Sequence, residues 1–473
     1  MNNPYKTLAG AATSLCCLSI FALSNVHAAE RSLPAAANIP WADDPSYLAD
    51  PQLRNSDFLG ALRYIPLSAD PQDYFSLGGE LRYQYLDYEH SLLGTRGADK
   101  GNSMLQQRIR LSGDLHLGSA FRLFVELGDN REFGADVPTR YNNDRTDVQQ
   151  MFVDLSAQVN QLGTAVLRAG RFVMPLGSGR LMGLREGANV RYTYDGVKAS
   201  LLLKPGTRID AFAVHPTDID PDEFDNQPDR TKEHSGIYAT NIASPLEGAK
   251  LDLYLYSSGR DLAVYNNAVG KERRNSFGSR LYGGIDAWDY DLEAVWQSGS
   301  TAGQKIRAWG LMSDAGYRFT DLPLTPRLGV RANAFSGDKD SSDSTLNTFA
   351  PISAAPALLF TDANWFAAMN LINVGPQLTL DWTPKLTTTL QVEYLARQST
   401  DDGIYFHPTL APYAANQGDA RHVATNTNLY LDWQVNRFAK VHVGYTHVQA
   451  GQALKDINGV NSDYLGIYTQ FLF

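Results

Sequence analysis

Apolar and polar residues alternate with a period of two along most of the chain after residue 74. In 105–117, leucine or isoleucine occupies positions 105, 109, 111, 115 and 117, and Arg108, Arg110 and Asp114 stand between them. The same alternation runs through 121–127, 378–382 and 441–445. Period-2 alternation over about ten residues indicates β-strands with one apolar and one polar face.

The lengths of the connections distinguish a membrane barrel from a soluble β-sandwich, because both alternate. About 18 strands are predicted, beginning near residues 75, 104, 119, 145, 163, 192, 207, 233, 250, 273, 288, 304, 325, 370, 386, 422, 438 and 461. Every second connection is very short, as at 118–119 and 436–437, and the intervening ones are usually long, as at 174–191 and 338–368. Tight turns on one rim and long loops on the other are typical of bacterial outer-membrane barrels.

We therefore predict an all-β fold, in which residues 75–473 form a transmembrane antiparallel up-and-down β-barrel in the bacterial outer membrane. The sheet must close, because lipid offers no hydrogen-bond partner to an open edge. At about 18 strands the lumen is too wide for side chains alone to fill it, so either it conducts or loops narrow it. The final segment 464–473 alternates and ends on Phe473, which resembles the strand recognised by the barrel-assembly machinery.

The chain before the barrel divides into two segments. Residues 1–28 form a predicted secretory signal, with Lys6 before a mostly apolar stretch and Ala28 at the cleavage position. Residues 29–74 are rich in proline and aspartate, which predicts an irregular periplasmic N-terminal arm. A short plug is the alternative interpretation of this arm.

The amino-acid composition and the motif content exclude several kinds of site and partner. Both cysteines, Cys16 and Cys17, lie in the signal, so the mature chain has no disulfide and no thiolate metal site. Loss of Lys6 leaves 40 basic against 51 acidic residues, a net charge of −11, which argues against a nucleic-acid binder. The sequence contains no P-loop, GxGxxG or nucleophile elbow, so we expect neither a cofactor nor an enzyme. The acidic run 218–225 is either a calcium site or solvated loop charge.

Five arginines fall between residues 168 and 191, and Glu186 is the only acid among them. On an exposed loop such charges only repel, whereas inside a pore they form an anion-selecting constriction. Strand parity adds further arginines on the polar faces. The predicted substrate-binding residues of the constriction are Arg82, Arg108, Arg110, Arg122, Arg168, Arg171, Arg180, Arg185, Arg191, Glu80, Asp114 and Glu126. A structural network of inward ion pairs is the alternative role.

Several short segments resemble the alginate-export family of outer-membrane porins. They are 63–67 (RYIPL), 77–82 (LGGELR), Gly170-Arg171, 179–181 (GRL), Arg191, 195–197 (DGV), Gly337-Asp338 with Thr348-Phe349, and 402–405 (DGIY). The resemblance spans the arm and the barrel. It implies an 18-stranded barrel whose arginine-rich constriction passes an anionic uronic-acid polymer. Guanidinium groups suit this substrate, because they bind carboxylates in bidentate fashion.

The leading hypothesis is a passive channel for an anionic polysaccharide such as alginate, embedded in outer-membrane lipid. A specific porin for small organic anions is the alternative within transport. Two hypotheses come from other classes. An outer-membrane hydrolase needs a Ser or Asp with His at one rim, and a structural barrel needs a lumen blocked by packed side chains.

Overall fold

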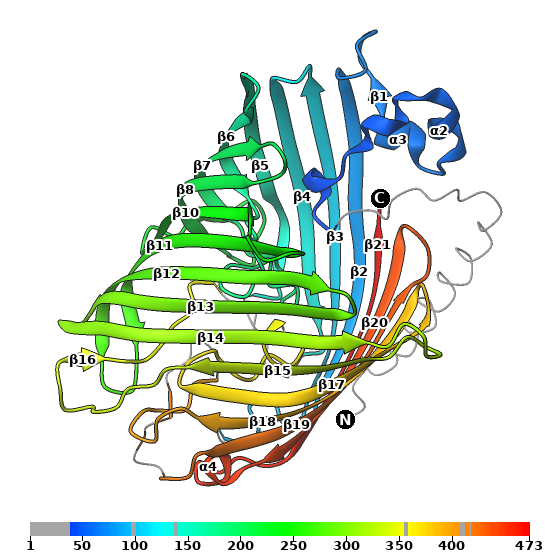
Figure 1. Cartoon of the computed structure of the whole chain (residues 1–473). Coiled ribbons are helices and arrows are strands. Elements are labelled where there is room, and N and C mark those ends of the chain that lie inside the picture. Colours follow the sequence, from blue (N-terminus) through cyan, green and yellow to red (C-terminus); the bar gives the residue numbers. More distant parts are fainter. Residues whose placement is uncertain are drawn as a thin grey trace.

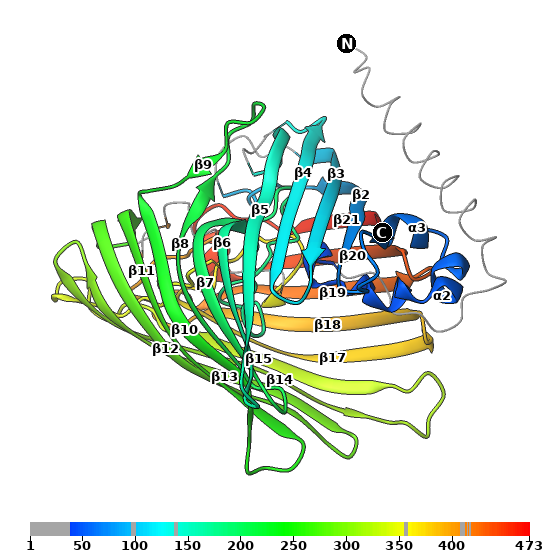
Figure 2. The same ribbon diagram turned by 90° about the horizontal axis from the view of Figure 1, so that it is seen from above.

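The computed structural model describes residues 38–95, 101–136, 141–353, 358–406, 412–413, 415 and 418–473. Within these ranges, 18 long strands form one closed antiparallel barrel (Figures 1 and 2). The first barrel strand pairs with the last, from Glu80 opposite Leu472 to Tyr88 opposite Tyr464, and this pairing closes the wall.

The barrel strands are β2 (Tyr74–Tyr88), β3 (Asn102–Leu117), β4 (Phe121–Phe133), β5 (Asp144–Val159), β6 (Gly163–Phe172), β7 (Tyr194–Leu203), β8 (Arg208–Asp218), β10 (Lys232–Ala243), β11 (Ala249–Val264), β12 (Val269–Ile285), β13 (Trp288–Thr301), β14 (Gln304–Arg318), β15 (Arg327–Phe335), β17 (Leu371–Thr383), β18 (Leu386–Arg397), β19 (His422–Gln434), β20 (Ala439–Ala450) and β21 (Ser462–Leu472). Short additional pieces are β9 (Gln227–Pro228), β16 (Thr345–Leu346) and α4 (Gln452–Lys455). Every predicted strand start lies within four residues of an observed one.

The wall of the barrel is polar inside and apolar outside. On β3, Ile109 and Leu111 are 42% and 54% exposed, whereas Arg108 and Arg110 are 0% and 2% exposed. A soluble domain shows the reverse, and this arrangement fits a wall that faces lipid. Tryptophans at the short-turn ends of β13, β17 and β19 are exposed, as in the aromatic belts at membrane interfaces.

The alternation of short and long connections is less strict than predicted. Two connections on the long-loop rim, 265–268 and 302–303, are themselves short. The strands on either side of the connection 265–268, β11 and β12, are 16 and 17 residues long. Residues expected in a long loop therefore belong to the strands at this point. On the other rim, the connection 319–326 is longer than a tight turn.

The N-terminal arm consists of short helices beside the short-turn rim, close to the end of β21 (Figures 1 and 2). Its elements are η2 (Pro40–Ala42), η3 (Pro45–Ala49), α2 (Pro51–Ser56), α3 (Gly60–Arg63) and β1 (Ile65–Pro66). Three of the helices begin at proline, which suits the first helical turn, and none exceeds six residues. Among the described residues, no helix is long and apolar enough to cross a membrane. The predicted signal and residues 29–37 lie outside the described part of the chain.

Loops fill the lumen near the long-loop rim. Phe349 and Phe360 from the connection 336–370 pack against Phe335 of β15, with ring centroids 5.3 and 6.3 Å apart. In the same connection, the amide of Ala367 donates to the carbonyl of Tyr405 at 3.1 Å, which joins it to the connection 398–421. We call the described parts of 336–370 and 398–406 the loop plug. A third connection, 173–193, touches it through a bridge between Met182 and Ser353.

Candidate functional site

Four arginines and three glutamates meet on the inner wall of β2 to β4, beneath the connection 173–193. Two of the arginines, Arg82 and Arg108, stand directly opposite each other on β2 and β3. Like charges in this position repel. The carboxylate of Glu186 lies between them, with one oxygen 3.1 Å from Arg82 and 2.8 Å from Arg108. The remaining members of this arginine–glutamate cluster are Glu80, Arg110, Glu126 and Arg191.

Arg108 and Arg191 hold the connection 173–193 against the wall. The guanidinium of Arg108 donates to the backbone carbonyls of Asn189 and Ala188 at 2.7 and 2.8 Å. Arg191 lies 2.5 Å from Glu186 and 3.2 Å from Glu80. Both arginines are almost completely buried. Their role in the structure is therefore to anchor the loop.

In the connection 173–193, the charged forms of Glu186 and Arg191 stabilise each other. Burial alone would raise the pKa of Glu186, but Arg191, Arg108 and Arg82 outweigh it and hold this pKa well below its ordinary value. Burial would likewise lower the pKa of Arg191, and Glu186 and Glu80 reverse this effect and raise it. Both groups are therefore ionised at neutral pH.

A second polar row crosses the inner wall closer to the short-turn rim. The pairing register places Arg122 of β4 opposite Asp154 of β5, then Arg168 of β6, then Lys198 of β7. Arg168 makes two hydrogen bonds of 2.7 Å to Asp154. Arg122 is paired with Asp114 of β3, its Nε lying 2.8 Å from a carboxylate oxygen. Six residues of β4, about 20 Å of strand, separate Arg122 from Gly128, the partner of Arg110.

The other predicted loop arginines lie in different surroundings. Arg180 reaches β13, where Asp291 and Glu293 lie 2.9 and 3.6 Å from its guanidinium. Arg185 stacks between two tyrosines, 4.9 Å from the ring centroid of Tyr141 and 5.1 Å from that of Tyr192. Among the described residues, no carboxylate lies within ion-pair distance of Arg185.

Arg171 does not belong to this interior, so its predicted position at the constriction is wrong. It pairs across the sheet with Met151, which is 52% exposed on the outer wall. Residues 163–172 form the strand predicted to begin near residue 163, and in a strand Arg168 and Arg171 point to opposite faces. The guanidinium of Arg171 binds Asp195 at 2.9 Å and the carbonyl of Asn226 at 3.1 Å.

Some cations of the lumen keep donors that the protein does not use. None of the three guanidinium nitrogens of Arg110 has a hydrogen-bond partner among the described residues, although the side chain is buried. Nη1 of Arg168 is likewise unpartnered there. Buried polar groups normally find partners, so these nitrogens hold hydrogen-bonding capacity that the described residues leave unused.

Sequence reasoning missed three residues of the interior. The first is Glu186, although its position as the lone acid among five arginines was a signal. The second is Lys198, whose buried position on β7 followed from strand parity. The third is Trp41 of the arm, which reaches the second row, and no local pattern indicated this. Within the described residues, no group of histidine, aspartate and glutamate is arranged to hold a metal ion.

Comparison with known proteins agrees with this architecture. The barrel is similar to that of OccK2 (OpdF) of Pseudomonas aeruginosa, crystallised in complex with glucuronate, at 12% identity and a TM-score of 0.56, covering 84% of this chain and 98% of that one. OccD3 (OpdP) of the same organism is 12% identical with a TM-score of 0.56, and the match covers 91% of this chain and 98% of that one. A BenF-like porin of Pseudomonas fluorescens is 10% identical with a TM-score of 0.56, and the match covers 84% of this chain and 99% of that one. At such low identities, the likeness shows the fold.

The family comparison covers most of the chain. The model of the family described as "Alginate export" matches residues 73–468, which confirms the resemblance in the sequence. No curated protein sequence matches. The family and the porin-like barrel together indicate an outer-membrane channel and not an enzyme. This chain belongs to the alginate export family.

Proposed function

We propose that this channel passes an anionic polysaccharide of the polyuronate class, and that guanidinium groups of the lumen bind its carboxylates in turn. The observation that carries the proposal is the unused donor capacity of Arg110, Arg168 and Arg185. An anion gains most from donor nitrogens that make no hydrogen bond to the protein, because no such bond has to be broken. Family membership supports this substrate class.

The separation of these cations suits a polymer. Arg110 and the second row lie on neighbouring strands about 20 Å apart along β4, and Arg185 lies in the connection 173–193, beside Tyr141 of the connection between β4 and β5. A polyuronate carries about one carboxylate per sugar, so it can occupy several such positions at once. Exchange between weak positions permits passage, whereas one tight site would trap the chain.

A porin for small organic anions is the second candidate, and the loop plug favours it. Aromatic side chains of the plug narrow the lumen at the long-loop rim, and a narrow lumen admits a single acid more easily than a chain. One of the similar porins was crystallised with glucuronate and another structure contains vanillate. The two candidates share the same cations and differ in substrate length.

Block of single-channel current in a planar lipid bilayer tests the proposal. We expect an oligouronate to block the purified channel at concentrations at least tenfold below those of glucuronate at equal carboxylate. Arg110→Gln should weaken this block, because it removes the unpartnered guanidinium. Arg131→Gln is the matched control, since Arg131 is half exposed at the end of β4 and pairs with Asp129.

Two results would contradict the proposal that the substrate is a polymer. Equal block by glucuronate and the oligouronate would favour the porin for small anions. An unchanged block in Arg110→Gln would remove Arg110 from the path. Recognition of the strand ending at Phe473 by the assembly machinery remains a separate prediction.

A further inference from the structure

We infer that Trp41 of the N-terminal arm is a tethered plug, which occupies an anion subsite formed by Arg168 and Lys198 in the short-turn half of the lumen. The inference rests on the proposed channel and adds a control to it. An anionic ligand must displace Trp41 before it can use this subsite. The arm therefore closes the channel at the short-turn rim when no ligand is bound.

Trp41 lies against the inner wall and occupies the subsite that we propose for the anionic ligand. Its ring centroid is 4.2 Å from the guanidinium carbon of Arg168, which also lies 3.6 Å from the ring centroid of Phe152. Its carbonyl accepts a 2.7 Å hydrogen bond from Arg122. Its indole Nε1 donates to Gln150 at 3.0 Å. An aromatic face on a guanidinium is a cation–π contact, which a carboxylate can replace with a stronger charge-assisted bond.

The subsite has hydrogen-bond donors that the protein leaves unused. Arg168 is 5% exposed and binds Asp154 through Nε and Nη2, but its Nη1 has no partner among the described residues. Lys198 is 4% exposed, and no carboxylate in the described chain lies within ion-pair distance of its ammonium. The ammonium of Lys198 lies 5.7 Å from the ring centroid of Trp41 and 5.9 Å from that of Phe172. Two buried cations between aromatic rings suit a carboxylate on a sugar ring, with the rings packing on its apolar face.

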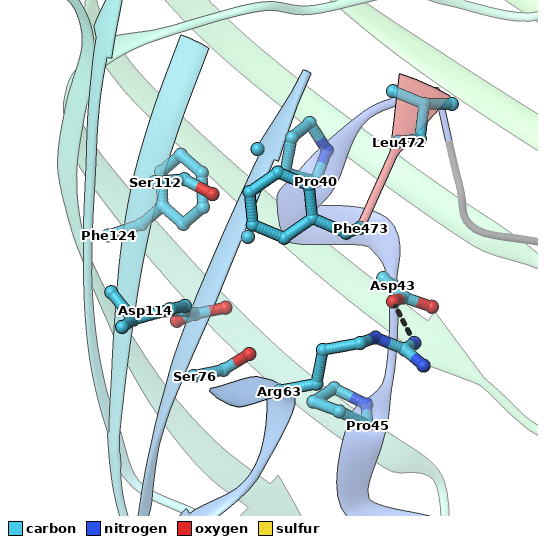
Figure 3. Close-up of a pocket in the computed structure, with 13 residues that line it drawn as sticks. Pro40, Asp43, Pro45, Arg63, Ser76, Ser112, Asp114, Phe124, Leu472 and Phe473 are labelled. Carbon is cyan, nitrogen blue, oxygen red and sulfur yellow. Dashed lines mark hydrogen bonds and ion pairs between the residues drawn. The ribbon is translucent and has the colours of Figure 1, made fainter. Parts of the chain in front are cut away.

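The helix that carries Trp41 is short and is attached to the barrel mainly through Trp41 itself. The helix η2 contains no buried residue. Between it and the barrel, a cavity of about 20 Å³ remains, lined among others by Pro40, Asp43 and Phe473 (Figure 3). This volume accommodates about one water molecule. Trp41 itself packs against the apolar interior and meets Phe152 edge-on, with ring centroids 6.1 Å apart, so a ligand must offset the loss of these contacts with charge-assisted bonds of its own.

The rest of the arm is held firmly, so Trp41 stays tethered when it leaves. Arg63 of α3 binds Asp57 at 2.8 Å and Asp43 at 2.6 Å, as Figure 3 shows for the second pair. Arg437, in the turn between β19 and β20, lies 3.2 Å from Asp57 and donates to Tyr47 at 2.9 Å. These ion pairs fix the arm to the rim.

Gln150 connects the plug to the arginine–glutamate cluster. Its amide oxygen accepts from Trp41 and from the backbone of Val173, where the connection 173–193 begins. Its amide nitrogen donates to Glu126 at 3.0 Å. Withdrawal of Trp41 therefore removes one hydrogen bond from a side chain that touches both the loop and the cluster.

Calorimetric binding of glucuronate to the full-length mature protein in detergent tests the subsite without requiring transport. Trp41→Ala should bind glucuronate at least tenfold more tightly than the wild type, and Trp41→Phe should fall between them. The double variant Trp41→Ala, Lys198→Met should lose this gain. Phe58→Ala is the matched control, because Phe58 is an aromatic residue of the same arm that is 70% exposed.

Bilayer recordings of the same variants test the closure. Trp41→Ala should raise the open probability at least twofold, and Phe58→Ala should leave it unchanged. Equal glucuronate affinity in the wild type and in folded Trp41→Ala protein would overturn the subsite. Equal open probability would overturn the closure. A gain in affinity with no conductance in any variant would instead refute the proposed channel function and leave the subsite intact.

Discussion

Arg185 differs from the other predicted arginines because two tyrosines flank it and, in the part of the chain that the structure describes, no acid lies within ion-pair distance of it. Its charge therefore acts on permeating ions at nearly full strength. A unit charge about 8 Å from an ion in a water-like medium contributes about 0.5 kcal/mol, which corresponds to a factor of about two in permeability. Arg185→Ser should lower the ratio of anion to cation permeability by about this factor, measured as the reversal potential in a salt gradient. Arg131→Ser should leave the ratio unchanged, and a similar fall in both variants would contradict the assignment.

Arg191 presents the opposite case, because it lies between Glu186 and Glu80 and is almost completely buried. Removing one partner of a buried ion pair leaves an uncompensated charge and costs about 3–5 kcal/mol. Arg191→Gln should therefore destabilise the docked connection 173–193 by this order, measured by urea titration of the protein in lipid vesicles. Arg191→Lys should recover part of the loss, since it restores the charge without the planar fork. A midpoint unchanged in Arg191→Gln would show that the loop docks without this pair.

The loop plug has a titratable contact between its two connections. Burial, as the largest effect, raises the pKa of Asp402, and burial followed by the charge of Asp402 raises the pKa of Asp338. An acid with a raised pKa in the folded state costs stability as pH rises from its unfolded pKa through its folded pKa, because the unfolded chain ionises first. The plug should therefore be more stable near pH 4 than at pH 7.

Hydrogen exchange at two amides measures this effect. Asp402 accepts hydrogen bonds from the amides of Asp338 and Gly403 at 2.8 and 2.7 Å. Their protection factors should be higher at pH 4 than at pH 7, after correction for intrinsic exchange. In Asp402→Asn the contribution of Asp402 disappears, so the dependence on pH should be weaker. Identical protection at both pH values in the wild type would refute the role of the pair.

The strands could be predicted from the sequence, and the course of the loops could not. The alternation of side chains along a strand is a local property. It correctly predicted that Arg82, Arg108, Arg110 and Arg122 point inward. The prediction for Arg171 failed because it was grouped with the other arginines of 168–191, although the strand predicted from residue 163 gives Arg171 the parity opposite to that of Arg168. Glu186 reaches Arg82, more than a hundred positions earlier in the chain, and such a contact depends on how the barrel brings distant strands together. Loops that narrow the lumen were one of the two expected outcomes, but the residues of the loop plug could not be predicted for the same reason.

At the scale of the molecule, the lumen has two obstructions of different kinds. In the proposed mechanism Trp41 closes the short-turn half, and aromatic side chains of the loop plug narrow the long-loop half. A barrel of this strand number is wide without such fillings. Its conductance is therefore set by segments that do not belong to the wall, and the wall should assemble without them.

Removal of the larger obstruction tests this separation of wall and filling. β15 and β17 pair up to Phe335 and Leu371, so a hairpin turn of about four residues can replace 336–370. Of the pairings between the strands, the replacement loses only the two-residue pairing of β16 with β14, and its other losses are contacts of the loops and of inward side chains. The barrel should therefore still form. Single-channel conductance should rise several-fold, because the aromatic filling is gone. Replacing only the exposed tip 339–344 by glycine and serine should leave conductance unchanged. If the long replacement folds with wild-type conductance, the current does not pass through the region that the plug fills, and the narrowest point lies at the arginine rows or at Trp41.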